Sequence, residues 1–400
     1  MNIISKAYSR CFQAGIRVLS KIIRFSIPKS YERLEDIAKS IKNHKLKKPI
    51  LVVSNTVSKL DRFKDLLASL DKEEISYFVY TGVGSDPTFK MIDVLTGFYK
   101  AHECDSIIAI GGGSIMDAAK VMGVLVKYPK KRIEKFRGVL KVHRNLPFFI
   151  AVPTTAGTGS EVTIAAVVTN EATGDKFSIS DGHLVPDEII LDDTLLKDLP
   201  KTIIAGSGMD ALTHAIEAYI GESGTKFTDT NALKAINLIG SNLEEFYNNP
   251  LNDSARKNML YASYHAGLAF TRAYVGYVHS LAHAVGGVYH KSHGLSVAIL
   301  LPYVLEAYGK NAYKKLAKAY DEINPLGYNL SIEDKAKSLI CYIRDLNKSL
   351  DIPSSFNGLI KEKDLDALAS HAAKEANPWY PVPKELSKKE LKEILIKANK

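Results

Sequence analysis

Four potential metal ligands, Asp210, His214, His279 and His293, lie within one stretch of this 400-residue chain. Asp210 and His214 are four residues apart, a spacing that puts both side chains on one face of a helix, where a single cation can bridge them. His279 and His283 repeat this spacing, and His293 follows ten residues later. One carboxylate oxygen together with imidazole nitrogens suits a borderline divalent cation. Any one of these histidines alone would more often cap a helix or line a polar pocket, but the whole set favours a metal site.

Two loops rich in small residues have the composition of a dinucleotide site. The first, Gly111-Gly112-Gly113-Ser114, follows an apolar run and precedes a helical pattern, and helix N-termini bind phosphate. It lacks the spacing of the G-x-G-x-x-G fingerprint, so a tight turn is the alternative. The second, at 153–163, follows the apolar run 148–152, and its hydroxyls can hydrogen-bond a nicotinamide, ribose or phosphate unless it is a plain turn. A metal site and a phosphate-binding loop in one chain indicate an enzyme that uses a dinucleotide.

The chain resembles the iron-containing (metal-dependent, group III) alcohol dehydrogenases. The resemblance extends from about residue 49 to residue 301, with a further echo at 377–383. It rests on four motifs in one order: GGGS-x-x-D at 111–117, PTTAGTGSEVT at 153–163, DALTHAIEAY at 210–219 and H-x3-H-x9-H at 279–293. Chance agreement of all four is very improbable.

The resemblance implies roles for individual side chains. Four residues would bind the metal: Asp210, His214, His279 and His293. His283 would lie beside the substrate and the cofactor. Four residues would hold the pyrophosphate, namely Gly112, Gly113, Ser114 and Asp117, and five would contact the rest of the dinucleotide, namely Thr154, Thr155, Thr158, Thr163 and Lys176. The ligand chemistry accepts Fe²⁺ or Zn²⁺, with zinc favoured by intrinsic affinity and iron by the resemblance.

The end of the first apolar strand departs from the pattern of relatives that prefer NAD. Such relatives often place an aspartate there, which bonds the adenosine ribose, whereas this chain has Asn55 after the run 50–54. A carboxylate would repel the 2′-phosphate of NADP, but a neutral amide accepts a ribose hydroxyl without excluding a phosphate. We therefore expect NADP(H) to be tolerated, and a preference for it over NAD(H) is the stronger form of this expectation.

The periodicity of the chain changes near residue 200. Before it, short β-branched runs (50–53, 75–80, 106–110 and 148–152) alternate with helical patterns, which predicts a parallel sheet in α/β units. After it, the stretches 202–220, 229–247, 255–273 and 333–346 show helical periodicity without intervening strands. We predict a basic N-terminal helical segment (1–48), a dinucleotide-binding α/β domain (49–200) and an all-helical metal-binding domain (201–400), the architecture that the resemblance implies and that dehydroquinate synthases share.

The net charge of +9 resides in the first 48 residues, where twelve Lys and Arg face three acidic residues. The rest of the chain is balanced, so the charge does not indicate a nucleic-acid partner. Residues 1–28 mix apolar and basic side chains, and we expect this segment to dock on the enzyme or on a neighbouring subunit. The alternatives are a helix that contacts a membrane surface and a transit-like peptide. Three widely separated cysteines indicate a reducing compartment, and we expect a cytoplasmic homodimer or higher homo-oligomer.

The predicted activity is reversible hydride transfer between a primary alcohol and a nicotinamide, with the metal as Lewis acid and an aldehyde as the oxidised partner. Our hypothesis for the proton relay is His283, and the alternative is that it only lines the pocket. A second function is a dehydroquinate synthase-like lyase or cyclase, but the motif at 210–217 matches the dehydrogenase pattern, and no cluster of Lys and Arg near the metal motifs suggests a phosphorylated substrate. A third is a catalytically silent binding protein on the same scaffold, which would be expected to have lost a ligand.

Overall fold

The computed structural model describes residues 12, 13, 15, 26–324 and 329–400. The chain divides into two compact units, one formed by Phe25–Asp198 and the other by Leu199–Lys400 together with Met1–Arg24. The division falls two residues before the expected domain boundary after residue 200.

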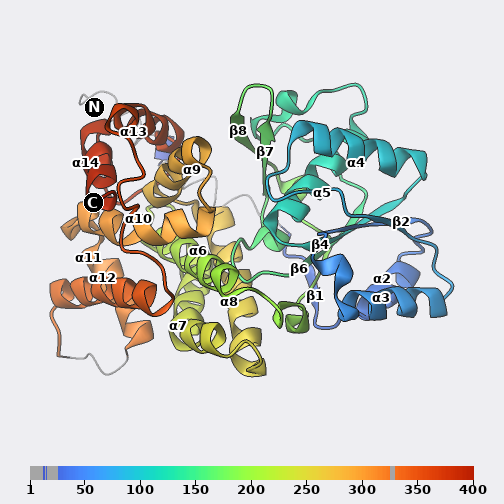
Figure 1. Ribbon diagram of the computed structural model, residues 1–400, viewed down its shortest axis with the longest axis horizontal. Helices are drawn as coiled ribbons and strands as arrows, with labels where there is room; N and C mark the ends of the chain where they lie inside the picture. Colours follow the sequence, from blue (N-terminus) through green and yellow to red (C-terminus); the bar gives the residue numbers. More distant parts are fainter. Residues whose placement is uncertain (1–11, 14, 16–25, 325–328) are drawn as a thin grey trace. The chain divides into compact units, whose positions relative to one another are not determined.

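The first unit is built on a six-stranded parallel sheet with the strand order β1-β9-β6-β4-β2-β3. Helices α2 (Asp36–Asn43) and α3 (Asp61–Lys72) lie on one face of the sheet, and α4 (Phe89–Ala101) and α5 (Gly113–Lys127) lie on the other (Figure 1). Coverage of both faces explains why the central strands are continuous apolar runs rather than alternating ones. The strands are β1 (Lys29–Tyr31), β2 (Pro49–Val53), β3 (Phe78–Tyr80), β4 (Ser106–Gly111), β6 (Phe148–Pro153) and β9 (Glu188–Ile190).

The direction in which the chain adds strands reverses between β2 and β4. From β2 the chain passes through α3 to its neighbour β3, then through α4 to β4 on the other side of β2, and through α5 to β6. Val53 and Ile110 are register partners at the carboxyl ends of β2 and β4. In open α/β sheets, ligands bind beyond the carboxyl ends of the strands at such a switch point. Asn55 and the glycine loop Gly111-Gly112-Gly113 follow these two strand ends.

A second, three-stranded sheet was not expected from the sequence. It consists of β5 (Gly138–Val139), β7 (Ala165–Asn170) and β8 (Asp175–Ser180) in the order β5-β8-β7, with β7 and β8 antiparallel. The turn between β7 and β8 ends at Gly174, whose φ of +70° suits glycine. Strand β7 packs against α5, so this sheet adjoins the helix that begins at the glycine loop.

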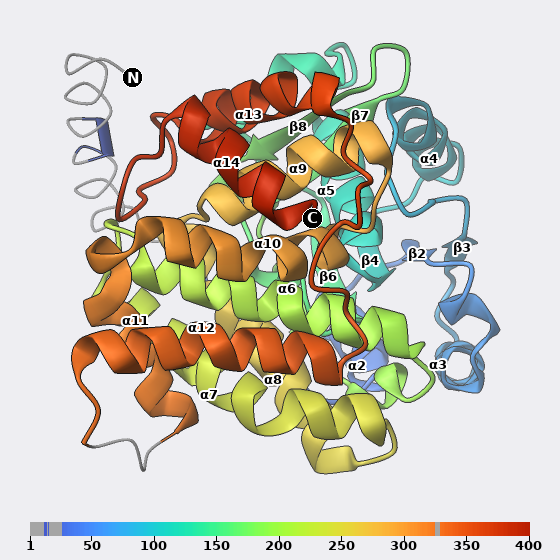
Figure 2. The same cartoon turned by 60° about the vertical axis from the view of Figure 1, so that its left-hand side comes forward.

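The second unit consists of packed helices over its described residues (Figure 2). Helix α6 is buried along almost its whole length and packs against α7, α8, α10 and α11. The periodicity predicted four of these helices to within a few residues. The helices are α6 (Lys201–Ile220), α7 (Lys226–Asn248), α8 (Asp253–Ala273), α9 (Tyr277–Tyr289), α10 (His293–Tyr308), α11 (Lys310–Ile323), α12 (Ile332–Ser349), α13 (Glu362–Ala376) and α14 (Lys388–Ala398).

The expected N-terminal segment, residues 1–48, is divided between the two units. Residues 29–43 form β1 and α2 of the first unit, because the backbone of this short polar run pairs with the distant strand β9. Of the earlier residues, the ring of Phe12 packs edge-on against Trp379 at 4.9 Å, and Gln13 Nε2 donates to the carbonyl of Tyr380 at 2.9 Å. These contacts agree with docking. Among the described residues, no helix is long and apolar enough to cross a membrane.

Candidate functional site

Three helices of the second unit bring Asp210, His279 and His293 together. Asp210 lies in the buried centre of α6, His279 in the first turn of α9, and His293 at the first residue of α10. Their ligand-type atoms all lie within 4.8 Å of one another. The approach of α10 to α6 depends on glycine, because a Cβ added to Gly294 would lie 2.4 Å from the carbonyl oxygen of Gly206.

The spacing of these atoms fits a single small cation. Asp210 Oδ1 lies 3.3 Å from His293 Nε2 and 3.6 Å from His279 Nε2. Ligand atoms about 2.1 Å from a shared tetrahedral ion are separated by roughly 3.4 Å. Asp210 Oδ1 and His279 Nε2 are buried, and neither forms a hydrogen bond within the described residues. Buried polar atoms are normally satisfied, so these two atoms and their donor chemistry fit a bound divalent metal.

His214, the fourth predicted ligand, lies at the edge of this group. Its Nδ1 is 3.8 Å from Asp210 Oδ1, one helical turn away, and its ring is stacked between Phe270 at 4.0 Å and His279 at 4.4 Å. It is not a member of the compact three-residue set. Its role as a ligand therefore stays a prediction.

The electrostatics of the group favour positive charge at its centre. Burial would raise the pKa of Asp210, but the facing imidazoles of His214, His293 and His279 hold this pKa well below its usual range. Burial would lower the pKa of His279, but the carboxylates of Asp210 and Glu217 outweigh it and raise this pKa to about 9. A cation bound between these side chains would supply the positive charge that the carboxylates favour.

Glu217 orients His279, a role that the sequence analysis did not assign. Its Oε2 lies 2.6 Å from His279 Nδ1 and accepts from the N–H of Gly276 at 2.8 Å, and its Oε1 accepts from the N–H of Val278 at 2.8 Å. A carboxylate on Nδ1 leaves Nε2 directed at Asp210. This arrangement of carboxylate, histidine and metal position is the usual support of a metal-binding imidazole.

His283 lies against the group but does not belong to it. Its ring is stacked on that of His293 at 5.1 Å, and its Nδ1 lies 2.7 Å from Glu375 Oε1. Glu375 also accepts from the hydroxyl of Tyr380 at 2.9 Å. His283 thus adjoins a residue of this group. Its predicted place beside the substrate and the cofactor and its catalytic role stay predictions.

The two small-residue loops of the first unit meet each other. The Cβ of an alanine at Gly113 would lie 2.9 Å from Thr158 Cγ2, and at Gly112 it would lie 3.4 Å from Thr155 Oγ1. Helix α5 begins at Gly113, so its first N–H groups lack partners within the helix. Glycine and hydroxyl-bearing residues are therefore grouped at one helix N-terminus, as phosphate binding requires.

Lys120 fastens the second loop to α5. It is completely buried, and its Nζ lies within 3.1 Å of five oxygen atoms on Ser160, Thr163 and Ala165. Asp117, one turn earlier, accepts from Ser160 Oγ at 2.8 Å and from the N–H of Val167 at 3.0 Å. The oxygens of Asp117 and the hydroxyl of Thr163 thus have partners inside the protein, and the dinucleotide contacts predicted for them stay predictions.

The other predicted dinucleotide residues are placed as follows. Asn55 is exposed just beyond β2. Ser114 Oγ donates to the carbonyl of Ser85, and Lys176 Nζ forms an exposed ion pair with Asp86 at 3.0 Å. Thr154 is buried, and its N–H donates to the carbonyl of Gly111 at 3.1 Å, which ties the start of the second loop to the first.

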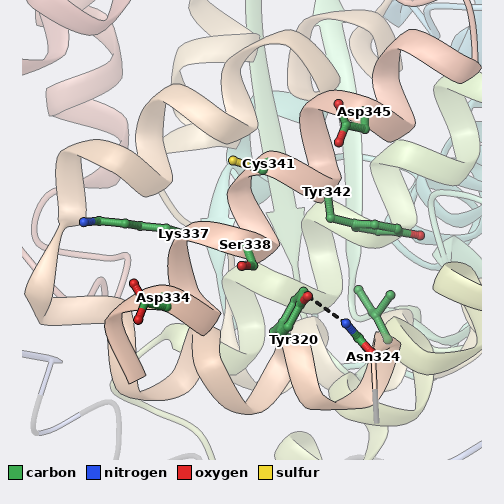
Figure 3. A pocket seen from close by; sticks show the side chains of 9 residues that line it. Tyr320, Asn324, Asp334, Lys337, Ser338, Cys341, Tyr342 and Asp345 are labelled. Carbon is green, nitrogen blue, oxygen red and sulfur yellow. Dashed lines mark hydrogen bonds between the residues drawn. The ribbon is translucent and has the colours of Figure 1, made fainter. Parts of the chain in front are cut away.

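A separate hollow of about 490 Å³ lies between α11 and α12 (Figure 3). Tyr320 and Asn324, which form a hydrogen bond of 2.8 Å, line it from the side of α11, and Ser338, Cys341 and Tyr342 line it from α12. None of the predicted site residues contributes to its wall.

Comparison with known proteins identifies the family. Residues 29–193 match the iron-containing alcohol dehydrogenase model, and residues 204–399 match the C-terminal model of the Fe-containing alcohol dehydrogenase family. The chain is 34% identical over 381 residues to an NADPH-dependent butanol dehydrogenase of Clostridium saccharobutylicum, covering 93% of this chain and 97% of that protein. It is 38% identical over 337 residues to a 1,3-propanediol dehydrogenase of Citrobacter freundii, covering 83% and 86% respectively.

Solved structures agree with this assignment. The chain matches a crystal structure of a 1,3-propanediol oxidoreductase with a TM-score of 0.90 and 32% identity, covering 94% of this chain and 99% of that one. An alcohol dehydrogenase from Oenococcus oeni matches with the same TM-score and coverage at 34% identity. The chain therefore belongs to the iron-containing alcohol dehydrogenase family and is an oxidoreductase of the alcohol dehydrogenase class.

Proposed function

We propose that this protein is a metal-dependent, NAD(P)-linked alcohol dehydrogenase and aldehyde reductase that transfers hydride reversibly between a primary alcohol and a nicotinamide. The observation that carries the proposal is the buried group of Asp210, His279 and His293, two of whose atoms form no hydrogen bond within the described residues. The family assignment and the names of the relatives, a butanol and a 1,3-propanediol dehydrogenase, support a short primary alcohol as the substrate.

The metal would be held by Asp210, His279 and His293, with His214 as the fourth ligand. Iron is the metal that the family suggests, and zinc suits the same donors. When bound, such an ion acts as a Lewis acid toward the alcohol or aldehyde oxygen. The protein's own part is to keep Asp210 ionised and to hold His279 in one orientation through Glu217.

The dinucleotide would bind at the loops beyond β4 and β6. Gly112 and Gly113 leave room for a pyrophosphate at the N-terminus of α5, and Thr155 and Thr158 lie against them. Asn55, exposed beyond β2, carries no charge to repel a 2′-phosphate, so we propose that NADP(H) is accepted.

His283 would exchange the proton of the substrate hydroxyl. Its Nδ1 is held by Glu375 at 2.7 Å, so Nε2 is the ring atom left for this exchange. The ring of His283 is stacked on that of His293 at 5.1 Å, beside the group of Asp210, His279 and His293, called the metal group below. If His283→Ala kept the turnover and the pH profile of the parent, this assignment would be wrong.

The test is anaerobic turnover of Fe²⁺-loaded protein with butyraldehyde, following the near-ultraviolet absorbance of NADPH and, separately, of NADH. We expect loss of absorbance that stops on chelation and returns with Fe²⁺, and that is absent in Asp210→Asn. An advantage of NADH over NADPH of about 100-fold or more would refute the proposed acceptance of NADP(H) while leaving the dehydrogenase activity in place.

The same experiment separates the two alternatives. A dehydroquinate synthase-like lyase recycles its cofactor, so it would show no net consumption of NADPH, and a silent scaffold would show none with any substrate. Within the described residues, His279 contacts the carboxylate of Glu217, His214 contacts the ring of Phe270, and His293 contacts the ring of His283. A homo-oligomer and a cytoplasmic location stay predictions, the first of which light scattering would test.

A further inference from the structure

The C-terminal end of α13 supplies a hydrogen-bonded chain to His283. Glu375 Oε1 lies 2.7 Å from His283 Nδ1 and accepts from the hydroxyl of Tyr380 at 2.9 Å. His371 Nε2 lies 3.8 Å from the other oxygen, Glu375 Oε2. The series of hydrogen bonds therefore runs from Tyr380 through Glu375 to His283. The ring of His283 is stacked on that of His293, one of the three clustered metal-binding candidates.

The tautomer of His283 follows from the charge of Glu375. Burial would raise the pKa of Glu375, but His283 and the hydrogen bonds from His283 and Tyr380 hold it below its ordinary value, so the carboxyl is ionised. An ionised carboxylate only accepts hydrogen bonds, so the hydrogen between the two groups lies on His283 Nδ1. In the neutral ring, Nε2 then carries no hydrogen and can accept one. The hydroxyl of Tyr380 likewise acts as a donor, in keeping with its raised pKa.

The position of Glu375 is fixed by packing and by backbone contacts. Helix α13 packs against α9, which carries His283 (Figure 2). Tyr277, the first residue of α9, donates its hydroxyl to Asn377 Oδ1 at 2.8 Å, and the N–H of Tyr380 donates to the carbonyl of Ala376 at 2.7 Å. The backbone immediately after Glu375 is thus anchored at two points.

We propose that Glu375 is a positioning residue: together with Tyr380 it fixes the ring of His283 with the hydrogen on Nδ1, and so reserves Nε2 as the acceptor for the substrate hydroxyl. The sequence motifs of the metal and dinucleotide sites do not include Glu375 or Tyr380. The proposal deepens the proposed function and rests on it, because it assigns to His283 a contact with the substrate.

A set of variants tests the proposal by turnover. Glu375→Leu removes the acceptor, Glu375→Gln keeps one oxygen acceptor, and Glu362→Leu changes an exposed glutamate at the other end of α13 as the matched control. We expect Glu375→Leu to lower kcat by about 10- to 100-fold, with metal content and the KM for NADPH unchanged. Glu375→Gln should recover most of the loss, and Glu362→Leu should match the parent.

Combination with His283→Ala makes the test specific. If Glu375 acts only through His283, the double variant Glu375→Leu/His283→Ala has the kcat of His283→Ala alone. Parental kcat in Glu375→Leu, or multiplicative losses in the double variant, would overturn the positioning role.

A second measurement does not depend on turnover. In Zn²⁺-loaded protein labelled with ¹⁵N-histidine, we expect the His283 ring, identified by its loss in His283→Ala, to show hydrogen on Nδ1 in the parent and in Glu362→Leu. Glu375→Leu should lose this signature and should still bind Zn²⁺. An unchanged signature in Glu375→Leu would overturn the proposal even in an active enzyme. An inactive parent with the expected signatures would refute the proposed function while supporting the positioning of His283.

Discussion

Replacing Glu217 by glutamine tests how metal binding depends on a residue that supports a ligand without being a predicted ligand itself. Glu217 accepts three buried hydrogen bonds, from His279 Nδ1 and from the N–H groups of Gly276 and Val278. A glutamine side chain has one oxygen and one NH₂ group at these positions. At least one of the three donors would then face another donor, and His279 would lose its charged partner.

The size of the effect follows from these contacts. An unsatisfied buried donor costs about 1–3 kcal/mol. Removing the partner that orients a ligating histidine typically weakens metal binding by about 10- to 100-fold. That range corresponds to roughly 1.4–2.8 kcal/mol of binding free energy. We therefore expect Glu217→Gln to lower metal affinity within this range and to lower the free energy of unfolding of the metal-free protein by a similar amount.

The assay is competition for Zn²⁺ with a chelator of known affinity, beside denaturant unfolding of the metal-free protein. Glu222→Gln is the matched control, because Glu222 is exposed two residues after the end of α6 and undergoes the same change of charge. The dissociation constants of the control and the parent should agree. Metal affinity in Glu217→Gln equal to that of the parent would show that Glu217 does not support His279 in the way described.

The other predictions concern the first unit. Burial raises the pKa of Glu161 from 4.5 to about 7, so between these values the folded protein keeps a proton that the unfolded chain has released, and stability falls as pH rises. The side chain of glutamine cannot ionise, so Glu161→Gln should exceed the parent in free energy of unfolding by about 1–3 kcal/mol at neutral pH and above. This gain should disappear near pH 4.5. Equal melting temperatures of the two proteins at neutral pH would refute this prediction. Lys120→Met leaves oxygen atoms of three residues without their buried donor, so it should lower the free energy of unfolding by roughly 3 kcal/mol and weaken NADPH binding. Denaturant unfolding and fluorescence titration measure these effects, with Lys127→Met as the control. Unchanged NADPH affinity would show that the contacts of Lys120 do not shape the cofactor loops. Asn55→Asp introduces a negative charge beyond β2 and should lower kcat/KM for NADPH by about tenfold or more with little change for NADH; parallel losses with both cofactors would place Asn55 away from the 2′-phosphate.

Elements with strong local signals were predictable. The apolar runs at β2, β4 and β6 and the periodic stretches at α6, α7, α8 and α12 appear as strands and helices within a few residues of the expected ends. The three-residue strands β1 and β9 were missed, because their backbones are ordered by pairing with distant neighbours rather than by a pattern of their own. Strands β7 and β8 form a partly exposed hairpin over 165–180, whose short runs the sequence analysis did not assign as strands.

The same distinction between local and long-range signals applies to the candidate site. Spacing on single helices pointed to Asp210, His214, His279 and His283. The residues that hold these and the loops in place were missed, because each acts across a long separation in sequence. Glu217 is 62 residues from His279, and Glu375 is 92 residues from His283. A lone glutamate in a helix leaves no local signal of such a role, and only the folded chain shows it.

The contacts of Phe12 and Gln13 with Trp379 and Tyr380 matter for handling the protein. Gln13 binds the carbonyl of the residue whose hydroxyl holds Glu375. Proteolytic trimming past residue 15 during purification would remove this link. Because the link leads to Glu375, we expect turnover to vary with the extent of cleavage, so intact mass should be checked before specific activities are compared.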